Sequence, residues 1–161
     1  MAAWITIYLQ EPLSLTGAAA IQREMPMPDW WTLGESLDLE EDEVDAFLAT
    51  LAWRDDPFEI HCEGRRPLQF HVWTDADRLR TEIEELDEIE GLVVPPSVRE
   101  HVKSVRMIVA IEMGFTQLET MFEVVAFEVA YWLAERGKGV IKGTNDAWFD
   151  HDQHRWDPIE A

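Results

Sequence analysis

The longest helix expected in this chain lies within residues 116–142, which read TQLETMFEVVAFEVAYWLAERGKGVIK. Thr116 and Glu119 have the spacing of a capping box, so they predict where the helix begins, and Gly137 is placed to end it. Between these ends, apolar residues recur every three or four positions and predict one wide buried face: Leu118, Met121, Phe122, Val125, Val129, Trp132 and Leu133. Residues 139–142 and 147–150 are then expected to pair as a small hairpin.

Strand patterns precede this helix. Alternating residue types predict an opening strand from Trp4 to Leu9 and an interior strand from Val105 to Met113. Residues 58–63 and 68–74 alternate in phase around a turn, which predicts a β-hairpin. Shorter helices are expected at residues 15–24, 44–51 and 74–91, and a short helix or turn is expected at residues 97–100.

The order of these elements predicts an α+β fold, with an antiparallel or mixed sheet and helices packed mainly on one face. Pro26 and Pro28 interrupt the helical pattern, so residues 25–31 are expected to form a loop or an irregular edge. A length of 161 residues is typical of one domain, which we expect to span residues 1–161. Residues 151–161 are polar and are expected to form a flexible tail.

The charge balance excludes several classes of protein. The chain has 33 Asp and Glu against 13 Lys and Arg, which leaves a net charge of −20. A hydrophobic content of 47% is too high for a disordered acidic chain. Direct nucleic-acid binding is not expected, because affinity for phosphate comes mainly from Lys and Arg.

A cytoplasmic location is expected from the rest of the composition. The single cysteine excludes an intramolecular disulfide framework and fits a reducing compartment. The first residues lack a basic segment followed by a long apolar run, so no secretory signal is expected. No stretch approaches the roughly 18 apolar residues that a membrane span requires, so no membrane association is expected.

Two groups of residues have the composition of catalytic or metal sites. Glu59, His61 and His71 are predicted to share one face of the hairpin, where a Glu–His pair could act as a base and its orienter, although ordinary cross-strand pairing predicts the same arrangement. A second group near the C-terminus consists of Asp150, His151, Asp152, His154 and Asp157. Two imidazoles three residues apart are possible metal ligands, but the expected tail would not hold them in place. We therefore expect no metal and no cofactor.

Acidic residues gather in two segments. Residues 35–63 contain eleven carboxylates and one arginine, and residues 75–90 contain eight carboxylates and two arginines. One interpretation is solubility, since net charge keeps protein molecules apart. The other is a negative surface for a basic partner, which would accelerate association and select against wrong partners. Trp30, Trp31 and Trp53 lie in or near the first segment, and tryptophan is enriched at binding hot spots.

The close of the chain resembles that of small acidic bacterial immunity proteins, which neutralise toxins delivered between competing cells. The likeness lies in a helix, a glycine and a short strand over residues 127–141, FEVAYWLAERGKGVI, followed by Trp148, and in the opening strand from Trp4 to Leu9. This resemblance implies a compact, cytoplasmic, disulfide-free protein that binds a toxin.

We therefore predict a non-enzymatic acidic binding protein, of immunity type, that occludes a basic toxin by placing carboxylates where substrate phosphates would lie. The residues expected to contact the partner are Glu40, Glu41, Asp42, Glu43, Asp45, Asp55, Asp56, Trp30, Trp31 and Trp53. One alternative is an adaptor or chaperone for a secreted effector that uses the apolar helix face and Met107, Met113 and Met121. Another is a small enzyme that uses Glu59, His61 and His71.

Overall fold

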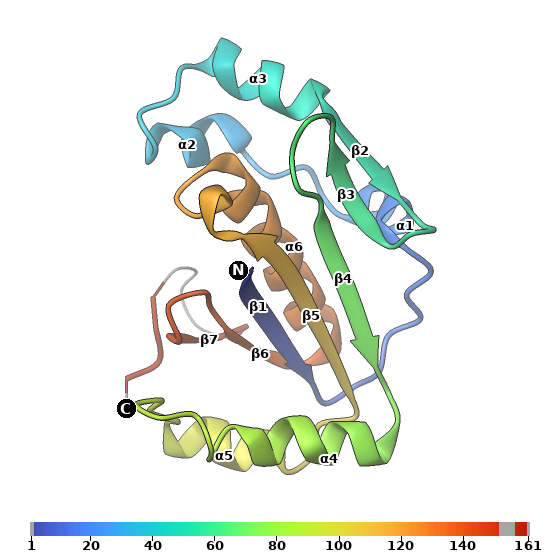
Figure 1. Cartoon of the computed structure of the whole chain (residues 1–161), viewed down its shortest axis with the longest axis vertical. Coiled ribbons are helices and arrows are strands. Elements are labelled where there is room, and N and C mark those ends of the chain that lie inside the picture. The colour runs from blue at the N-terminus through green and yellow to red at the C-terminus, as the bar shows by residue number, and fades with distance from the viewer. Residues whose placement is uncertain (1, 152–156, 161) are drawn as a thin grey trace. The chain divides into compact units, whose positions relative to one another are not determined.

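A computed structural model describes residues 2–151 and 157–160 (Figure 1). The strands are β1 Ala2–Leu9, β2 Leu51–Arg54, β3 Glu59–Cys62, β4 Leu68–Trp73, β5 Met107–Gly114, β6 Gly139–Lys142 and β7 Trp148–Asp150. The helices are α1 Ala18–Glu24, α2 Trp30–Glu35, α3 Glu41–Ala49, α4 Ala76–Glu85, α5 Pro96–Val102 and α6 Met121–Gly137, with a 3-10 turn at Phe115–Gln117. Within the described residues the strands form a seven-stranded antiparallel sheet in the order β2-β3-β4-β5-β1-β6-β7. The predicted α+β class and the long helix in the C-terminal half are thereby confirmed.

The described residues group into two compact units, each built from separate segments of the chain. Unit 1 comprises the described residues of Met1–Ala3, Leu15–Phe70 and Ile111–Val129. Unit 2 comprises those of Trp4–Ser14, His71–Ala110 and Ala130–Ala161. Four of the boundaries fall inside β1, β4, β5 and α6, so both units share regular elements. The single domain expected over residues 1–161 stays a prediction.

Unit 1 contains the paired residues of the predicted hairpin. β3 and β4 pair with Glu59 opposite Gln69 and Ile60 opposite Leu68, which confirms the in-phase alternation of the two segments. The rings of Phe58 and Phe70 stack with their centroids 4.7 Å apart. Aromatic contact also joins α3 to α6, where Phe47 and Phe122 meet edge to face at 4.9 Å. The contact between Phe58 and Phe70 lies on the apolar face that the alternation predicts.

Unit 2 is organised around β1, β6 and the helices α4 and α5 (Figure 1). β1 pairs with β6, with Thr6 opposite Lys142, and β6 pairs with β7, which confirms the predicted C-terminal hairpin. One apolar cluster includes the buried residues Tyr8, Leu79, Leu86, Val94, Val98, Val102, Ile108, Val140 and Trp148. Ile159 packs against this cluster and its backbone N–H donates to the Trp148 carbonyl at 2.6 Å. This part of the expected tail is therefore attached to unit 2.

Two short elements differ from the expectations. Residues 30 and 31 were expected in a loop or an irregular edge but begin α2, where the Asp29 carboxylate accepts hydrogen bonds from the Thr32 backbone N–H at 3.2 Å and the Thr32 hydroxyl at 2.8 Å. Six residues are too few for a helical repeat to be recognised, so the cap was the only local signal. Leu51 was expected on a helix but begins β2, which exists because it pairs with β3.

The long helix begins later than predicted. Thr116 lies in the 3-10 turn, and the Thr120 hydroxyl accepts a hydrogen bond from the Phe122 backbone N–H at 3.2 Å, at the start of α6. The helix includes Gly137, and the residue in the left-handed conformation is Lys138, with φ of 51°. Gly137 is needed for another reason: a Cβ there would lie 2.9 Å from the Glu11 carbonyl oxygen.

Candidate partner-binding surface

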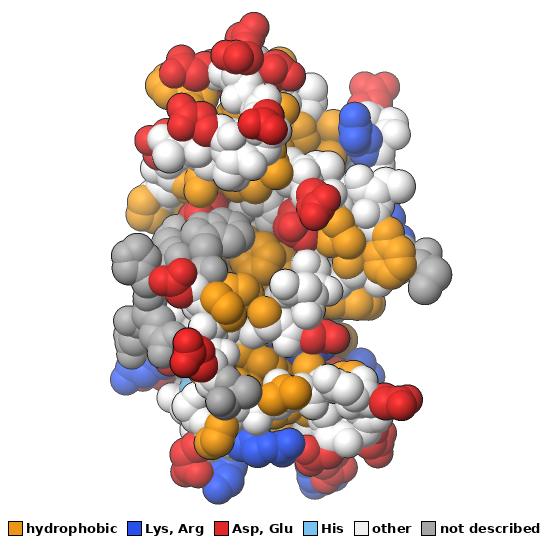
Figure 2. All heavy atoms as spheres, turned by 90° about the vertical axis from the view of Figure 1, so that its left-hand side faces the viewer, with side chains coloured by type: hydrophobic (Ala, Val, Ile, Leu, Met, Phe, Trp, Pro, Cys, Tyr) orange, Lys and Arg blue, Asp and Glu red, His pale blue; other side chains and the backbone are white. Residues whose placement is uncertain are grey.

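An acidic hollow of about 780 Å³ lies between α2, α3 and the loop that joins them. Figure 2 shows Asp and Glu side chains gathered over this part of unit 1, at the top of the view. The acidic hollow is lined by Leu39 and six carboxylates: Glu35, Asp38, Glu40, Glu41, Asp42 and Asp45. Four of the predicted contact residues, Glu40, Glu41, Asp42 and Asp45, are thus brought together. Glu35 and Asp38 were not among those predictions, although both belong to the same acidic run in the sequence.

Close packing of α2 on α3 shapes this hollow. A Cβ on Gly34 would lie 2.4 Å from Val44 Cγ2, so only glycine permits this approach. The Gly34 carbonyl accepts backbone hydrogen bonds from Leu37 at 3.0 Å and from Leu39 at 3.1 Å, and Asp38 has a positive φ of 59°. The chain therefore reverses directly after α2, and its acidic residues face the start of α3.

Some of these carboxylates also stabilise the local structure. Glu43 Oε1 accepts a hydrogen bond from the Glu40 backbone N–H at 3.2 Å, and Asp42 Oδ1 accepts one from the Glu43 N–H at 3.0 Å. Negative charge at the start of α3 also interacts favourably with the helix dipole. Each carboxylate has a second oxygen, and no Lys or Arg in the described part of the chain pairs with residues 35–45. The acidic hollow therefore retains acceptors for an external cation.

An apolar flank adjoins the acidic hollow and is formed by Met27, Trp30, Trp31, Leu48 and Trp53. Trp31 is 47% exposed, and its Nε1 donates to Asp45 Oδ1 at 2.7 Å, so this residue touches both surfaces. Trp30 is buried, and together with Trp53 it lines a hollow of about 300 Å³. Met27 is 83% exposed beside it. Sequence reasoning missed Met27 and Leu48, for which the only local signal was their position close to the tryptophans.

Asp55 and Asp56 lie elsewhere in unit 1. They come directly after β2, whereas the residues that line the acidic hollow come before α3 or in its first half. The rest of α3 and the whole of β2 therefore separate the two groups along the chain. Asp55 Oδ1 accepts a hydrogen bond from the Ala20 backbone N–H in α1 at 3.2 Å. Asp55 therefore has a structural role at the start of α1.

The acidic segment of residues 75–90 belongs to unit 2 and is organised differently. Arg78 pairs with Glu82 at 2.7 Å and Arg80 pairs with Asp77 at 2.8 Å, both on α4. Arg99 of α5 pairs with Asp87 at 2.7 Å. Several carboxylates of this segment are therefore matched by cations from their own unit, unlike those of residues 35–45.

The hairpin residues of the enzyme alternative have other partners. Glu59 is 8% exposed and lies 3.7 Å from the Arg54 guanidinium across the β2–β3 pair. His71 belongs to unit 2, where its ring centroid lies 5.4 Å from that of Trp4 and 6.1 Å from that of Trp73. His61 is half-buried on β3 in unit 1. Aromatic stacking of His71 and ion pairing of Glu59 account for the positions of both side chains.

The predicted C-terminal His/Asp group lies partly outside the described residues, which do not include Asp152 and His154. His151 Nδ1 donates to the Gly139 carbonyl at 2.8 Å and lies 3.2 Å from Asp150 Oδ1. Among residues 2–151 and 157–160, no group of three or more His, Cys, Asp or Glu side chains is arranged to hold a metal ion. No helix in the same ranges combines the length and apolar character needed to cross a membrane.

Comparisons with protein-family models, with curated proteins and with solved structures gave no match. Function is therefore inferred from the acidic hollow and its apolar flank.

Proposed function

We propose that this chain is a non-enzymatic binding protein of immunity type, which uses the acidic hollow and the apolar flank to occlude a basic toxin in the cytoplasm. The observation that supports the proposal is the meeting of two surfaces at Trp31. Six carboxylates without a cationic partner in the described part of the chain lie on one side of this residue, and exposed or half-exposed apolar side chains lie on the other.

The two surfaces have complementary roles in binding. The carboxylates attract a basic partner over several ångströms, which raises the association rate and makes it sensitive to salt. Trp31 and Met27 supply apolar area that becomes buried on contact, and such residues contribute most of the binding free energy at many interfaces. Carboxylates held against the active site of an enzyme that acts on phosphate esters would exclude its substrate by charge and by volume.

The adaptor alternative loses part of its support. Met107, Met113 and Met121 were expected to provide an adaptable apolar surface. All three are at most 3% exposed, and the apolar face of α6 is buried as well. In this conformation these residues belong to the core, so the apolar flank of α2 and α3 is the better candidate for contact.

The test is affinity capture from the native host, followed by a binding measurement on the purified partner. The binding variant is Glu40→Gln/Glu41→Gln/Asp42→Asn, and the matched control is Glu85→Gln/Glu88→Gln/Glu90→Gln. Both remove three exposed carboxylates, the control from unit 2. A third variant, Trp31→Ala, tests the apolar flank. Binding is measured by calorimetry at low and at physiological salt.

We expect one stoichiometric basic partner, whose own activity falls as this chain is added. The binding variant should weaken affinity by about tenfold or more, which corresponds to a loss of about 1.4 kcal/mol in binding free energy. It should also make affinity less dependent on salt, because fewer charges remain for salt to screen. The control should retain most of the affinity. Equal losses in both triple variants, or a partner that stays active when bound, would overturn the proposal.

A further inference from the structure

An open groove of about 720 Å³ lies in unit 2, between α4 and the segment that joins α5 to β5. One wall is a face of α4, because its lining residues Ala76, Leu79, Arg80 and Ile83 recur at helical spacing. The other wall runs from Val102 to Arg106. We call this feature the basic groove, for the charges described next.

Cations converge on the basic groove in a chain that has few of them. Arg80, Lys103 and Arg106 line it together with a single carboxylate among its lining residues, Glu84. In the whole chain, by contrast, 33 acidic residues outnumber 13 basic ones. Among its lining residues alone, positive charge therefore exceeds negative charge.

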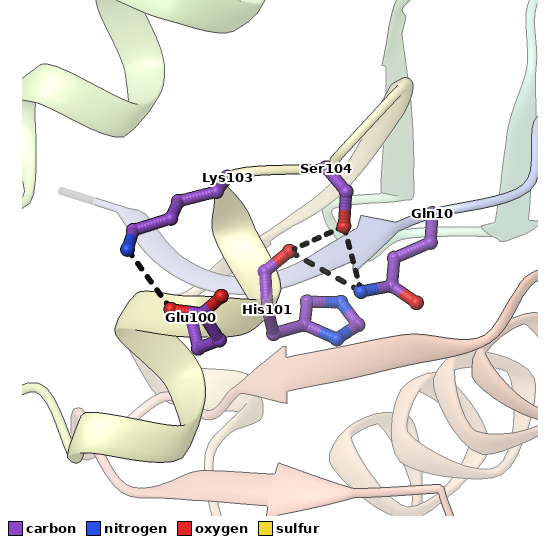
Figure 3. A network of polar contacts seen from close by, with 5 residues as sticks. All are labelled: Gln10, Glu100, His101, Lys103 and Ser104. Atoms are coloured by element: carbon purple, nitrogen blue, oxygen red, sulfur yellow. Dashed lines mark hydrogen bonds and ion pairs between the residues drawn. The ribbon is translucent and has the colours of Figure 1, made fainter.

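These cations are available to a ligand. Arg106 is exposed and forms no ion pair with the residues that the structure describes. Lys103 pairs with Glu100 at 2.9 Å (Figure 3), and Arg80 pairs with Asp77 at 2.8 Å. Both pairs are exposed to solvent, and such pairs contribute little free energy, so an incoming anion can compete for the cations.

The floor of the basic groove is apolar. Leu79 and Val102 are buried members of the unit 2 cluster, and Ile83 and Val105 are half-buried against it. These four side chains leave part of their surface open to the groove, below the cationic rim. A ligand that lies there would bury an apolar body and place a charged group at the rim.

Hydrogen bonds fix the wall beside α5 before any ligand binds. Gln10 Nε2 donates to Ser104 Oγ at 2.9 Å and to the His101 carbonyl at 3.4 Å (Figure 3). The Arg106 backbone N–H donates to the Leu9 carbonyl at 2.8 Å. The end of β1 thus holds the residues on both sides of Lys103, so little conformational freedom is lost on binding.

We propose that the basic groove binds a small organic anion with an apolar body, with a carboxylate or phosphate monoester as its charged group. Its volume lies within the range of small-molecule sites. The cationic rim favours anionic ligands over neutral and cationic ones, because an anion can pair with Arg106 and can compete for Arg80 and Lys103. This site is separate from the one proposed for the toxin, and either can fail without the other.

The test titrates the full chain with decanoate and with decyl phosphate, each below its micelle-forming concentration, and with decyltrimethylammonium as the cationic counterpart. Binding is measured by calorimetry. The variants Arg106→Gln and Arg80→Gln each remove one rim charge. The matched control is Arg65→Gln, which removes an exposed arginine from the β3–β4 turn in unit 1. Thermal unfolding of each variant confirms that it is folded.

We expect both anions to bind and the cation not to. Each rim variant should weaken binding by roughly tenfold, as expected for the loss of one charge-assisted hydrogen bond, and Arg65→Gln should match the wild type. The proposal is overturned if the cationic amphiphile binds equally well, or if all three variants lose the same affinity. Binding to anionic lipid vesicles without binding to the free anions would also contradict it.

Discussion

Asp29, Asp45 and Glu59 show how one side-chain chemistry takes different roles at different positions. Hydrogen bonds from the Thr32 hydroxyl and backbone N–H lower the pKa of Asp29, which caps α2. Asp45 accepts from Trp31 and so joins the two halves of the proposed binding surface. Glu59 is buried beside Arg54. The number of carboxylates alone therefore says little about binding, and their surroundings decide which of them remain available.

Protonation of His101 is expected to lower the stability of unit 2 at acidic pH. Burial lowers the pKa of His101, and this outweighs the opposing effect of its hydrogen bond to the Tyr8 carbonyl, where Nε2 donates at 2.9 Å. The folded protein thus prefers the neutral imidazole. The unfolded chain binds a proton near its usual pKa of about 6.5, so the free energy of unfolding falls as the pH drops through that value.

The variant His101→Gln removes this titration and keeps a side-chain N–H that can reach the Tyr8 carbonyl. We expect the fall in the free energy of unfolding between pH 7.5 and pH 5.5 to be smaller in the variant than in the wild type. Urea unfolding at several pH values measures both curves. Curves that run parallel over this range would show that His101 does not contribute to the acid sensitivity.

At the scale of elements, the start of α6 shows a difference between the cap that the sequence motif predicts and the cap that the structure contains. Thr116 and Glu119 match a capping box, but the segment from Phe115 to Gln117 is a 3-10 turn. The Gln117 side chain is buried there and accepts a hydrogen bond from the Gly114 backbone N–H at 2.7 Å. This contact holds the turn, so the first helical residue is Met121 and Thr120 provides the cap.

Thr120→Ala is expected to lower the free energy of unfolding by about 1 kcal/mol, the usual cost of losing a hydroxyl cap. Thr120→Ser keeps the hydroxyl, and Thr116→Ala alters only an exposed residue, so both should stay within about 0.5 kcal/mol of the wild type. Chemical unfolding of the three variants measures the difference. A larger loss from Thr116→Ala than from Thr120→Ala would place the functional cap at Thr116 instead.

For the whole molecule, the dominant property is the net charge of −20. Like charges at this density repel one another in the compact state more than in the extended unfolded chain. Added salt screens this repulsion, with a screening length of about 10 Å at 0.1 M. Electrostatic repulsion therefore opposes folding at low ionic strength.

We expect the urea midpoint of unfolding to rise when NaCl is added from about 20 mM to about 500 mM, because screening relieves the repulsion. The variant Glu85→Gln/Glu88→Gln/Glu90→Gln carries three fewer negative charges and should show a smaller rise. Sucrose at matched osmolarity controls for effects that do not depend on charge. A midpoint that falls with NaCl in the wild type would mean that attractive ion pairs outweigh the repulsion.

The elements that could be predicted from the sequence are those with a long or repeated pattern. The apolar repeat of α6, the in-phase hairpin of β3 and β4 and the alternation of β1 and β5 are visible in the local sequence, although α6 and β5 are buried on nearly all sides. The acidic run of residues 35–45 is also visible in the sequence, and the contact role expected of residues 40–43 and Asp45 stays a prediction. The α+β class followed from the order of these elements.

The remaining features depend on contacts between distant residues. β2 is a strand because β3 lies beside it, α6 begins at Met121 because Gln117 is buried in the turn before it, and the apolar flank forms where α2 packs on α3. The basic groove likewise brings together cations that lie far apart in the chain. Local patterns indicate which elements form, because apolar residues recur at the helix or strand period, but only the packed structure determines which side chains are buried and which of them meet.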